Sequence, residues 1–158
     1  MNNNFIFKPS KFYKKNIGEF SKNLKIFFKK NSYSVNKLKI LDFGCGNCTL
    51  HKFLKFKTIY LYDPNLEAYK IKLSKNFKFF KTYENFTFSN VKFDAIILNS
   101  VVQYIEPNVL KKIIPVFLKK LNKKGIVIIS DIPDRPRLLE LLNIQNWIIS
   151  LRLLFYFI

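Results

Sequence analysis

The 158-residue sequence contains few residues of several types, and each shortage narrows what the protein can do. Two cysteines, Cys45 and Cys48, are too few for the disulfide framework of a small secreted domain. The single histidine, His51, leaves no set of histidines and cysteines large enough for an ordinary zinc site. No apolar run reaches the roughly 20 residues that span a bilayer, and the N-terminus lacks the apolar stretch of a secretory signal. We therefore expect a cytoplasmic protein.

Acidic residues are also scarce, since 10 of them stand against 28 basic ones and give a formal net charge of +18. Such a charge is compatible with a nucleic-acid or anionic-membrane partner. However, only three basic residues are arginines (Arg135, Arg137 and Arg152), and the rigid arginine fork is the usual reader of phosphates and bases. The lysines are spread along most of the chain. We favour a solvated basic surface, with recruitment of an anionic partner as the alternative.

Short apolar segments separated by turn residues predict five β-strands. They are Leu38–Phe43, Thr58–Asp63, Phe77–Tyr83, Phe93–Ser100 and Gly125–Ile132. Apolar residues at consecutive positions are typical of strands covered on both faces, as in a parallel sheet. Amphipathic helices are predicted over 17–30, before the first strand, and over 65–75 and 107–121, between strands, with another helix from about Asn47. This alternation predicts an α/β fold with a doubly wound, mostly parallel sheet of at least five strands.

The chain is predicted to form a single domain, 1–158, in three parts. Residues 1–36 form an N-terminal helical segment, 37–133 a ligand-binding core, and 134–158 an apolar C-terminal helix or lid. Contact of the last apolar run with a membrane surface or a partner is the alternative for that segment. Self-association is also considered, because a five-stranded sheet would leave one edge uncovered.

The stretch "LDFGCGN", Leu41 to Asn47, joins the first predicted strand to a turn. Asp42 is the last polar residue of the strand, and Gly44 and Gly46 allow the backbone to turn tightly and approach a ligand. The next strand ends at Asp63, whose carboxylate can accept hydrogen bonds from two vicinal ribose hydroxyls. The sequence therefore predicts a ligand site where these strands end.

Cys45, Cys48 and His51 suggest two other kinds of site. Three soft ligands at this spacing could hold zinc only if a carboxylate completed the set of four. A redox Cys-x-x-Cys also follows a strand, but it would leave Asp42 and Asp63 unexplained. We favour Cys45 as a small side chain in a tight turn and His51 as a partly exposed helix residue, and predict no metal site.

Four segments in order resemble the motifs of the class I S-adenosylmethionine-dependent methyltransferase family. "LDFGCGN" is similar to its first motif and "YLYDP" to its second. "FDAIILNSVVQYI" resembles its fourth strand and active-site lip, and "FLKKLNKKGIVIISDIP" its next helix, turn and fifth strand. The resemblance covers about Leu38 to Pro133. It implies a Rossmann-like methyltransferase fold, S-adenosylmethionine as cofactor and methyl transfer as the reaction.

Two departures from the family pattern support an alternative function. A third glycine of the first motif would fall at Cys48, where this chain has a side chain. The family usually adds two antiparallel strands after the fifth, whereas residues 134–158 predict a helix. The alternative is therefore a non-catalytic or truncated remnant that binds S-adenosylmethionine. A nicotinamide-binding protein is disfavoured because the G-x-G-x-x-G pattern is incomplete.

The resemblance also assigns roles to individual residues. It implies a cofactor site made of Asp42, Gly44, Cys45, Gly46, Asp63, Pro64, Glu84, Asn99 and Ser100. In that site Asp42 lies near the ammonium group, Asp63 holds the ribose, and Glu84 lies near the adenine amine. Weaker candidates for contact with the methyl acceptor are Gln103, Tyr104 and Asp131; no catalytic base is identified. The segment "ILNSVVQY" lacks the [DN]-P-P-[YFW] sequence, so we expect a small-molecule, lipid or sugar acceptor rather than nucleic acid.

Overall fold

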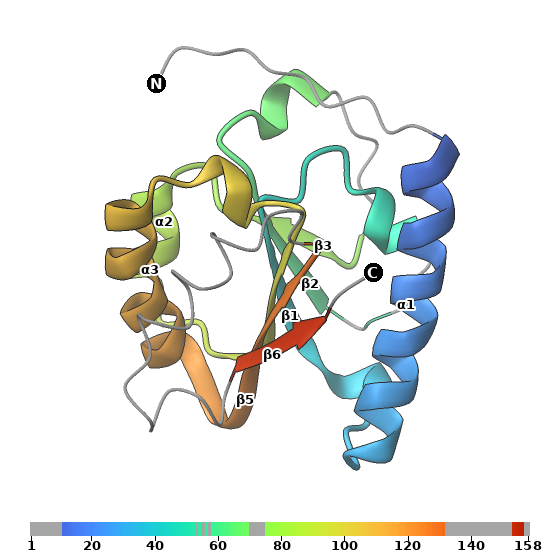
Figure 1. Cartoon of the computed structure of the whole chain (residues 1–158). Coiled ribbons are helices and arrows are strands. Elements are labelled where there is room, and N and C mark those ends of the chain that lie inside the picture. The colour runs from blue at the N-terminus through green and yellow to red at the C-terminus, as the bar shows by residue number, and fades with distance from the viewer. Residues whose placement is uncertain are drawn as a thin grey trace.

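The computed structural model describes residues 11–52, 54, 56, 58–69, 75–131 and 153–156. Six strands form one sheet in the order β3-β2-β1-β4-β5-β6, and every described pairing is parallel (Figure 1). The strands are β1 (Lys39–Phe43), β2 (Thr58–Tyr62), β3 (Phe77–Phe79), β4 (Phe93–Asn99), β5 (Leu121–Ser130) and β6 (Leu153–Tyr156). The strand order reverses between β1 and β4, so their carboxyl ends form the switch point where ligands bind in such sheets.

Helices cover both faces of this sheet (Figure 1). Helix α1 (Lys11–Lys30) packs on one face, and α2 (Tyr83–Phe88) and α3 (Pro107–Lys120) lie on the other. Four short 3₁₀ helices complete the described structure: η1 (Val35–Lys37), η2 (Thr49–Lys52), η3 (Leu66–Tyr69) and η4 (Val102–Tyr104). Among the described residues, no helix combines the length and apolar character needed to cross a membrane.

The apolar positions of α1 and α3 explain why these helices pack on the sheet. In α1 the buried residues recur at three- and four-residue spacing, as in Ile17, Phe20, Leu24 and Phe28. On the other face, a second cluster includes Leu110, Ile114 and Phe117 of α3 and Phe86 of α2. The two clusters sandwich the strands, and the predicted doubly wound parallel fold is confirmed.

Several boundaries differ from the prediction. The helix expected from about Asn47 is a single 3₁₀ turn, η2, in its described part. The segment expected to be helical over 65–75 is described as η3 and then, after residues outside the described set, as a turn at Lys75. Helix α2 was not predicted; it is short and capped by the Thr82 hydroxyl, which accepts a hydrogen bond from the Asn85 N–H. Local turn and cap chemistry decides these short elements.

The C-terminal segment differs most from its prediction. A helix or lid was expected over 134–158, but the four residues described there form strand β6, parallel to β5. Val127 lies opposite Leu153, and Ser130 opposite Tyr156. The reason is tertiary. Without β6, the outer edge of β5 would leave backbone N–H and C=O groups unpaired. The "LLFY" segment pairs with these groups, and its aromatic residues are of a type enriched in strands. The edge of β5 is thus covered.

Gly125 permits a close approach between β5 and β4, where the strand register shifts between Phe93 and Ala95. A Cβ at residue 125 would lie 2.8 Å from the Phe93 carbonyl oxygen and 2.9 Å from Leu121 Cβ. We therefore expect Gly125→Ala to lower the free energy of unfolding by about 2 kcal/mol, measured by urea denaturation. Lys124→Ala, at an exposed neighbouring position, should change it by less than about 0.5 kcal/mol. Equal losses in both variants would contradict the steric explanation.

Candidate functional site

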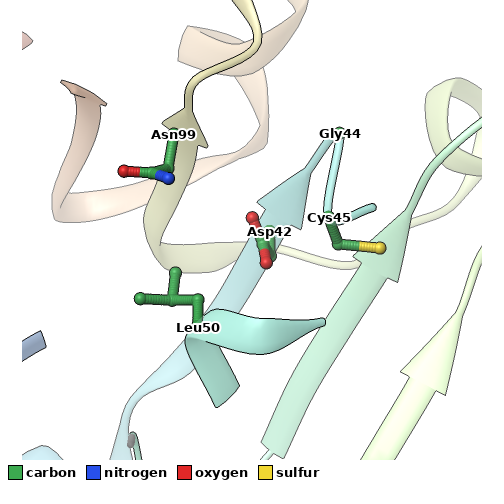
Figure 2. Close-up of a pocket in the computed structure, with 5 residues that line it drawn as sticks. All are labelled: Asp42, Gly44, Cys45, Leu50 and Asn99. Carbon is green, nitrogen blue, oxygen red and sulfur yellow. The ribbon is translucent and has the colours of Figure 1, made fainter. Parts of the chain in front are cut away.

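A small pocket lies at the switch point between β1 and β4. It is lined by Asp42 of β1, Gly44 and Cys45 of the following loop, Leu50 of η2 and Asn99 at the end of β4. Figure 2 shows the Asp42 carboxylate between Asn99 and the η2 ribbon, with the Cys45 sulfur pointing away from Asn99. The pocket thus brings together four of the residues predicted to bind a cofactor, from two separate parts of the chain, with Leu50 as the fifth lining residue.

Asp42 is buried and paired with His51. Asp42 is only 3% exposed, and its Oδ2 lies 2.7 Å from His51 Nε2. His51 is itself only 6% exposed and packs edge-on against the Phe77 ring, with 5.6 Å between ring centroids. The prediction of a partly exposed His51 was therefore wrong, because η2 turns its side chain inward towards β1 and β3. This residue was missed as a site residue; the one available signal was a lone histidine close in sequence to the acid of the turn.

Glycine is favoured at the two positions of the loop, 44 and 46, for different structural reasons. Both have positive φ, +78° at Gly44 and +49° at Gly46. A Cβ on Gly44 would overlap Cγ2 of Val101 and lie 2.9 Å from Cγ1, so packing already requires glycine there. A Cβ on Gly46 would meet nothing closer than the Tyr69 hydroxyl oxygen at 4.0 Å. The backbone at Gly46 is therefore the part of the loop that a ligand could approach.

The two cysteines are buried and not joined by a disulfide. Cys48 has a φ of +57°, the left-handed conformation that favours glycine, which gives a physical reason for the glycine of the family pattern at this position. A side-chain hydrogen bond with Cys48 and burial raise the pKa of the Cys45 thiol well above its usual value. Among the described residues, no three histidine, cysteine or acidic side chains are grouped so as to hold a metal ion.

Asp63 follows β2 and ties the glycine loop to it. Its Oδ2 accepts a hydrogen bond from the Gly46 N–H at 2.9 Å, and its Oδ1 accepts one from the Asn65 N–H at 2.8 Å. Burial raises the pKa of the Asp63 carboxyl, although the two backbone hydrogen bonds oppose that shift. The Asp63 carboxyl is thus held beside the open backbone of Gly46, in surroundings where burial disfavours its charged form.

A second polar cluster lies at the ends of β4 and β5. The Ser130 hydroxyl donates to Asn99 Oδ1 at 2.7 Å, and the Ser100 hydroxyl donates to the Asp131 carboxylate. Ser100 and Asp131 both have left-handed backbones, with φ of 57° and 56°. This conformation costs about 1–2 kcal/mol for a residue with a side chain, and such strain tends to concentrate at functional sites.

Gln103 joins this second cluster, whereas Tyr104 does not. Gln103 Nε2 donates to the Ser100 carbonyl oxygen at 2.9 Å, and its Oε1 is buried without a hydrogen-bond partner. Tyr104 is 65% exposed. Of the remaining predicted residues, Pro64 and Glu84 are exposed and neither lines the pocket. Their predicted contact with the adenine part of a cofactor has no support in the pocket itself.

The chain is thus a doubly wound α/β protein with a pocket at the carboxyl ends of β1 and β4. Residues 11–154 match the sequence profile of a family described as a methyltransferase domain, and the chain belongs to that family. No curated protein matches it.

Solved structures of methyltransferases share the fold. The S-adenosylmethionine-bound CalS10, an amino pentose methyltransferase from Micromonospora echinaspora, has a TM-score of 0.61, 14% identity, and a match over 87% of this chain and 61% of its own. The N-methyltransferase NodS from Bradyrhizobium japonicum, solved with S-adenosylhomocysteine, has a TM-score of 0.52 and 17% identity, and the match covers 70% of this chain and 60% of NodS. An S-adenosylmethionine-dependent methyltransferase from Leishmania major has a TM-score of 0.53 and 18% identity, and the match covers 71% of this chain and 48% of its own. The match thus spans about half to three fifths of the length of these proteins.

Proposed function

We propose that the chain binds S-adenosylmethionine at the β1–β4 pocket and transfers its methyl group to a small-molecule, lipid or sugar acceptor. The observation that carries this proposal is the buried carboxylate of Asp42 in the pocket, close in the fold to the open backbone of Gly46. A buried anion without a lysine or arginine partner among the described residues suits a cationic ligand. Membership of the methyltransferase domain family and two neighbours solved with S-adenosylmethionine or S-adenosylhomocysteine support the choice of ligand.

The residues present fit the cofactor's groups. Asp42 has one carboxylate oxygen without a hydrogen-bond partner among the described residues and would hold the ammonium group. Asp63 would hold the ribose hydroxyls, because each of its oxygens can accept a second hydrogen bond. Gly46 would let the ligand approach the backbone. The bound cofactor supplies a methyl group already activated on a sulfonium, so the protein's task is positioning and exclusion of water.

We propose the acceptor site at the polar cluster beyond β4 and β5. The Asp131 carboxylate would take the proton from an acceptor hydroxyl or protonated amine, and Ser100 orients it through their hydrogen bond. The unpartnered Oε1 of Gln103 would accept a hydrogen bond from the same acceptor. A small polar acceptor such as an amino sugar suits this cluster, and the amino pentose specificity in the name of one neighbour agrees with that choice.

Calorimetric titration with S-adenosylmethionine and S-adenosylhomocysteine tests the cofactor site directly. We expect dissociation constants in the micromolar range, about −8 kcal/mol. A folded chain that binds neither compound would contradict the proposal.

The second candidate function is binding of the cofactor without methyl transfer. Two observations favour it: Val101 fills the space above Gly44, and both oxygens of Asp63 already hold backbone N–H groups. Micromolar binding of S-adenosylhomocysteine with no transfer to a panel of amino sugars, sugars and lipids would favour this alternative over the enzyme.

Asp131→Asn tests the assignment of the base. We expect the rate of methyl transfer to the best amino-sugar acceptor of that panel to fall by about a hundredfold, because an amide cannot take the proton. The matched control is Asp94→Asn, near the start of β4 and so at the opposite end of the parallel strands from Asp131. Asp94 Oδ2 accepts a hydrogen bond from the Lys39 N–H at 2.8 Å. Initial rates with labelled S-adenosylmethionine give both numbers, and an equal fall in the two variants would refute the role of Asp131.

A further inference from the structure

His51, which forms a buried pair with Asp42, has none of the roles proposed so far. His51 Nε2 lies 2.7 Å from Asp42 Oδ2, and the other ring nitrogen, Nδ1, is buried without a hydrogen-bond partner. Asp42 lines the pocket, whereas His51 does not, so His51 can act on a ligand only through Asp42. The pair is therefore a possible means of controlling the charge that the pocket presents.

The hydrogen-bond geometry selects one tautomer of His51. Asp42 Oδ2 is an acceptor, so the facing Nε2 must carry a proton and donate it. A second proton on Nδ1 would be a buried donor with no acceptor, next to the apolar ring of Phe77. Burying that unsatisfied donor would cost free energy. Of the two neutral tautomers, the one protonated on Nε2 is the one that can donate to Asp42.

The two protonation states of His51 present different charges to the pocket. A neutral His51 fixes the carboxylate of Asp42 by one hydrogen bond and leaves its negative charge available to a ligand cation. A protonated His51 forms an ion pair with Asp42 and offsets that charge. Among the residues that the structure describes, the Asp42 charge interacts with two other titratable groups, Asp63 and Cys45, and neither of them becomes cationic.

We propose that His51 is a positioning residue for the cofactor: its neutral Nε2–H form orients Asp42 towards the ammonium group, and protonation of His51 weakens cofactor binding. This inference rests on the proposed function. By mass action, a group that must lose a proton before the ligand binds weakens the apparent affinity about tenfold for each pH unit below its titration midpoint.

The first test needs no cofactor. His51 is the only histidine of the chain, so its ring nitrogens give a single, unambiguous set of signals in a nitrogen-15 NMR spectrum. We expect the pattern of the neutral Nε2–H tautomer at pH 7.5, and a titration whose midpoint is read from the same signals. A neutral ring protonated on Nδ1 at pH 7.5, or a ring already charged there, would overturn the inference.

The second test measures S-adenosylhomocysteine affinity by calorimetry between pH 5.5 and 8 for three chains. In the wild type, affinity should decline below the midpoint found by NMR, by about tenfold per unit. His51→Gln retains a side-chain N–H donor for Asp42 but cannot gain a charge. The affinity of this variant should therefore change by less than about twofold between pH 5.5 and 8. Lys111→Gln, at an exposed position of α3, should keep the wild-type profile.

The outcomes separate this inference from the proposed function. Binding that is equally pH-dependent in the wild type and His51→Gln would overturn the role of His51 and leave the cofactor site intact; Asp63, whose pKa burial raises, would then be the group to suspect. Binding that is flat with pH in both chains would also overturn it. Absence of binding by a folded chain at every pH would overturn the proposed function, and this inference with it.

Discussion

Asp63→Ala should weaken the binding of S-adenosylhomocysteine by at least about a hundredfold, or close to 3 kcal/mol. Two losses combine in this variant. The acceptor proposed for the ribose hydroxyls disappears, and the Gly46 N–H and Asn65 N–H lose the carboxylate that holds the loop in place. The free energy of unfolding should fall by a smaller amount, about 1–2 kcal/mol, because burial already disfavours the charge of this carboxyl and raises its pKa.

Asp94→Ala is the matched control for this variant. Asp94 also binds two partners through its carboxylate, accepting from the Lys39 N–H at 2.8 Å and from Asn122 Nδ2 at 2.6 Å. Asp94 lies near the start of β4, at the opposite end of the strand from the pocket. We expect a similar loss of stability with unchanged affinity. If calorimetry gives the two variants the same affinity, Asp63 has no special role in ligand binding and the pocket has been assigned wrongly.

Gly44→Ala should cost about 3 kcal/mol of unfolding free energy, measured by urea denaturation. An alanine there would adopt a left-handed backbone, with φ of +78°, and its Cβ would overlap the side chain of Val101. Backbone strain supplies about 1–2 kcal/mol and the steric overlap the rest. This is the largest effect on stability that we expect from a single methyl group in the loop.

Two further variants separate strain from overlap. Gly46→Ala has a similar backbone, φ of +49°, but open space around the new Cβ, so it should lose only the 1–2 kcal/mol of strain. In the background of Val101→Ala, the cost of Gly44→Ala should fall by about 1–2 kcal/mol, which a double-mutant cycle measures. A cycle with no coupling would show that Val101 moves aside freely, and that packing does not require glycine at position 44.

The sequence predicted the fold and the approximate position of the pocket because both follow from patterns of short range. Continuous apolar runs that end at Asp42, Asp63 and Asn99 place these side chains at one edge of a parallel sheet, whatever the details of the loops. Gly44 and Gly46, the glycines of the turn, both have the positive φ that only a structure can measure. In this part of the chain, local preference and overall topology agree.

The remaining features depend on contacts between distant residues. His51 was expected at a partly exposed helix position, but the carboxylate of Asp42 and the ring of Phe77 hold it inside. Strand β6 replaces an expected helix because β5 provides a pairing partner. Neither result follows from spacing alone, since each depends on what the rest of the fold leaves unpaired. The contact between Gly44 and Val101 is of the same kind.

The burial of Cys45 and Cys48 has a consequence for the chemical durability of the loop. The thiolate is the form of cysteine that reacts with peroxides and alkylating agents, and the raised pKa of the Cys45 thiol leaves little thiolate at neutral pH. The Cys-x-x-Cys spacing resembles that of an oxidoreductase, yet here both thiols are buried and the Cys45 thiol is kept protonated. Oxidants should therefore damage this loop slowly while the chain is folded, and electrophilic compounds aimed at its cysteines should be poor inhibitors.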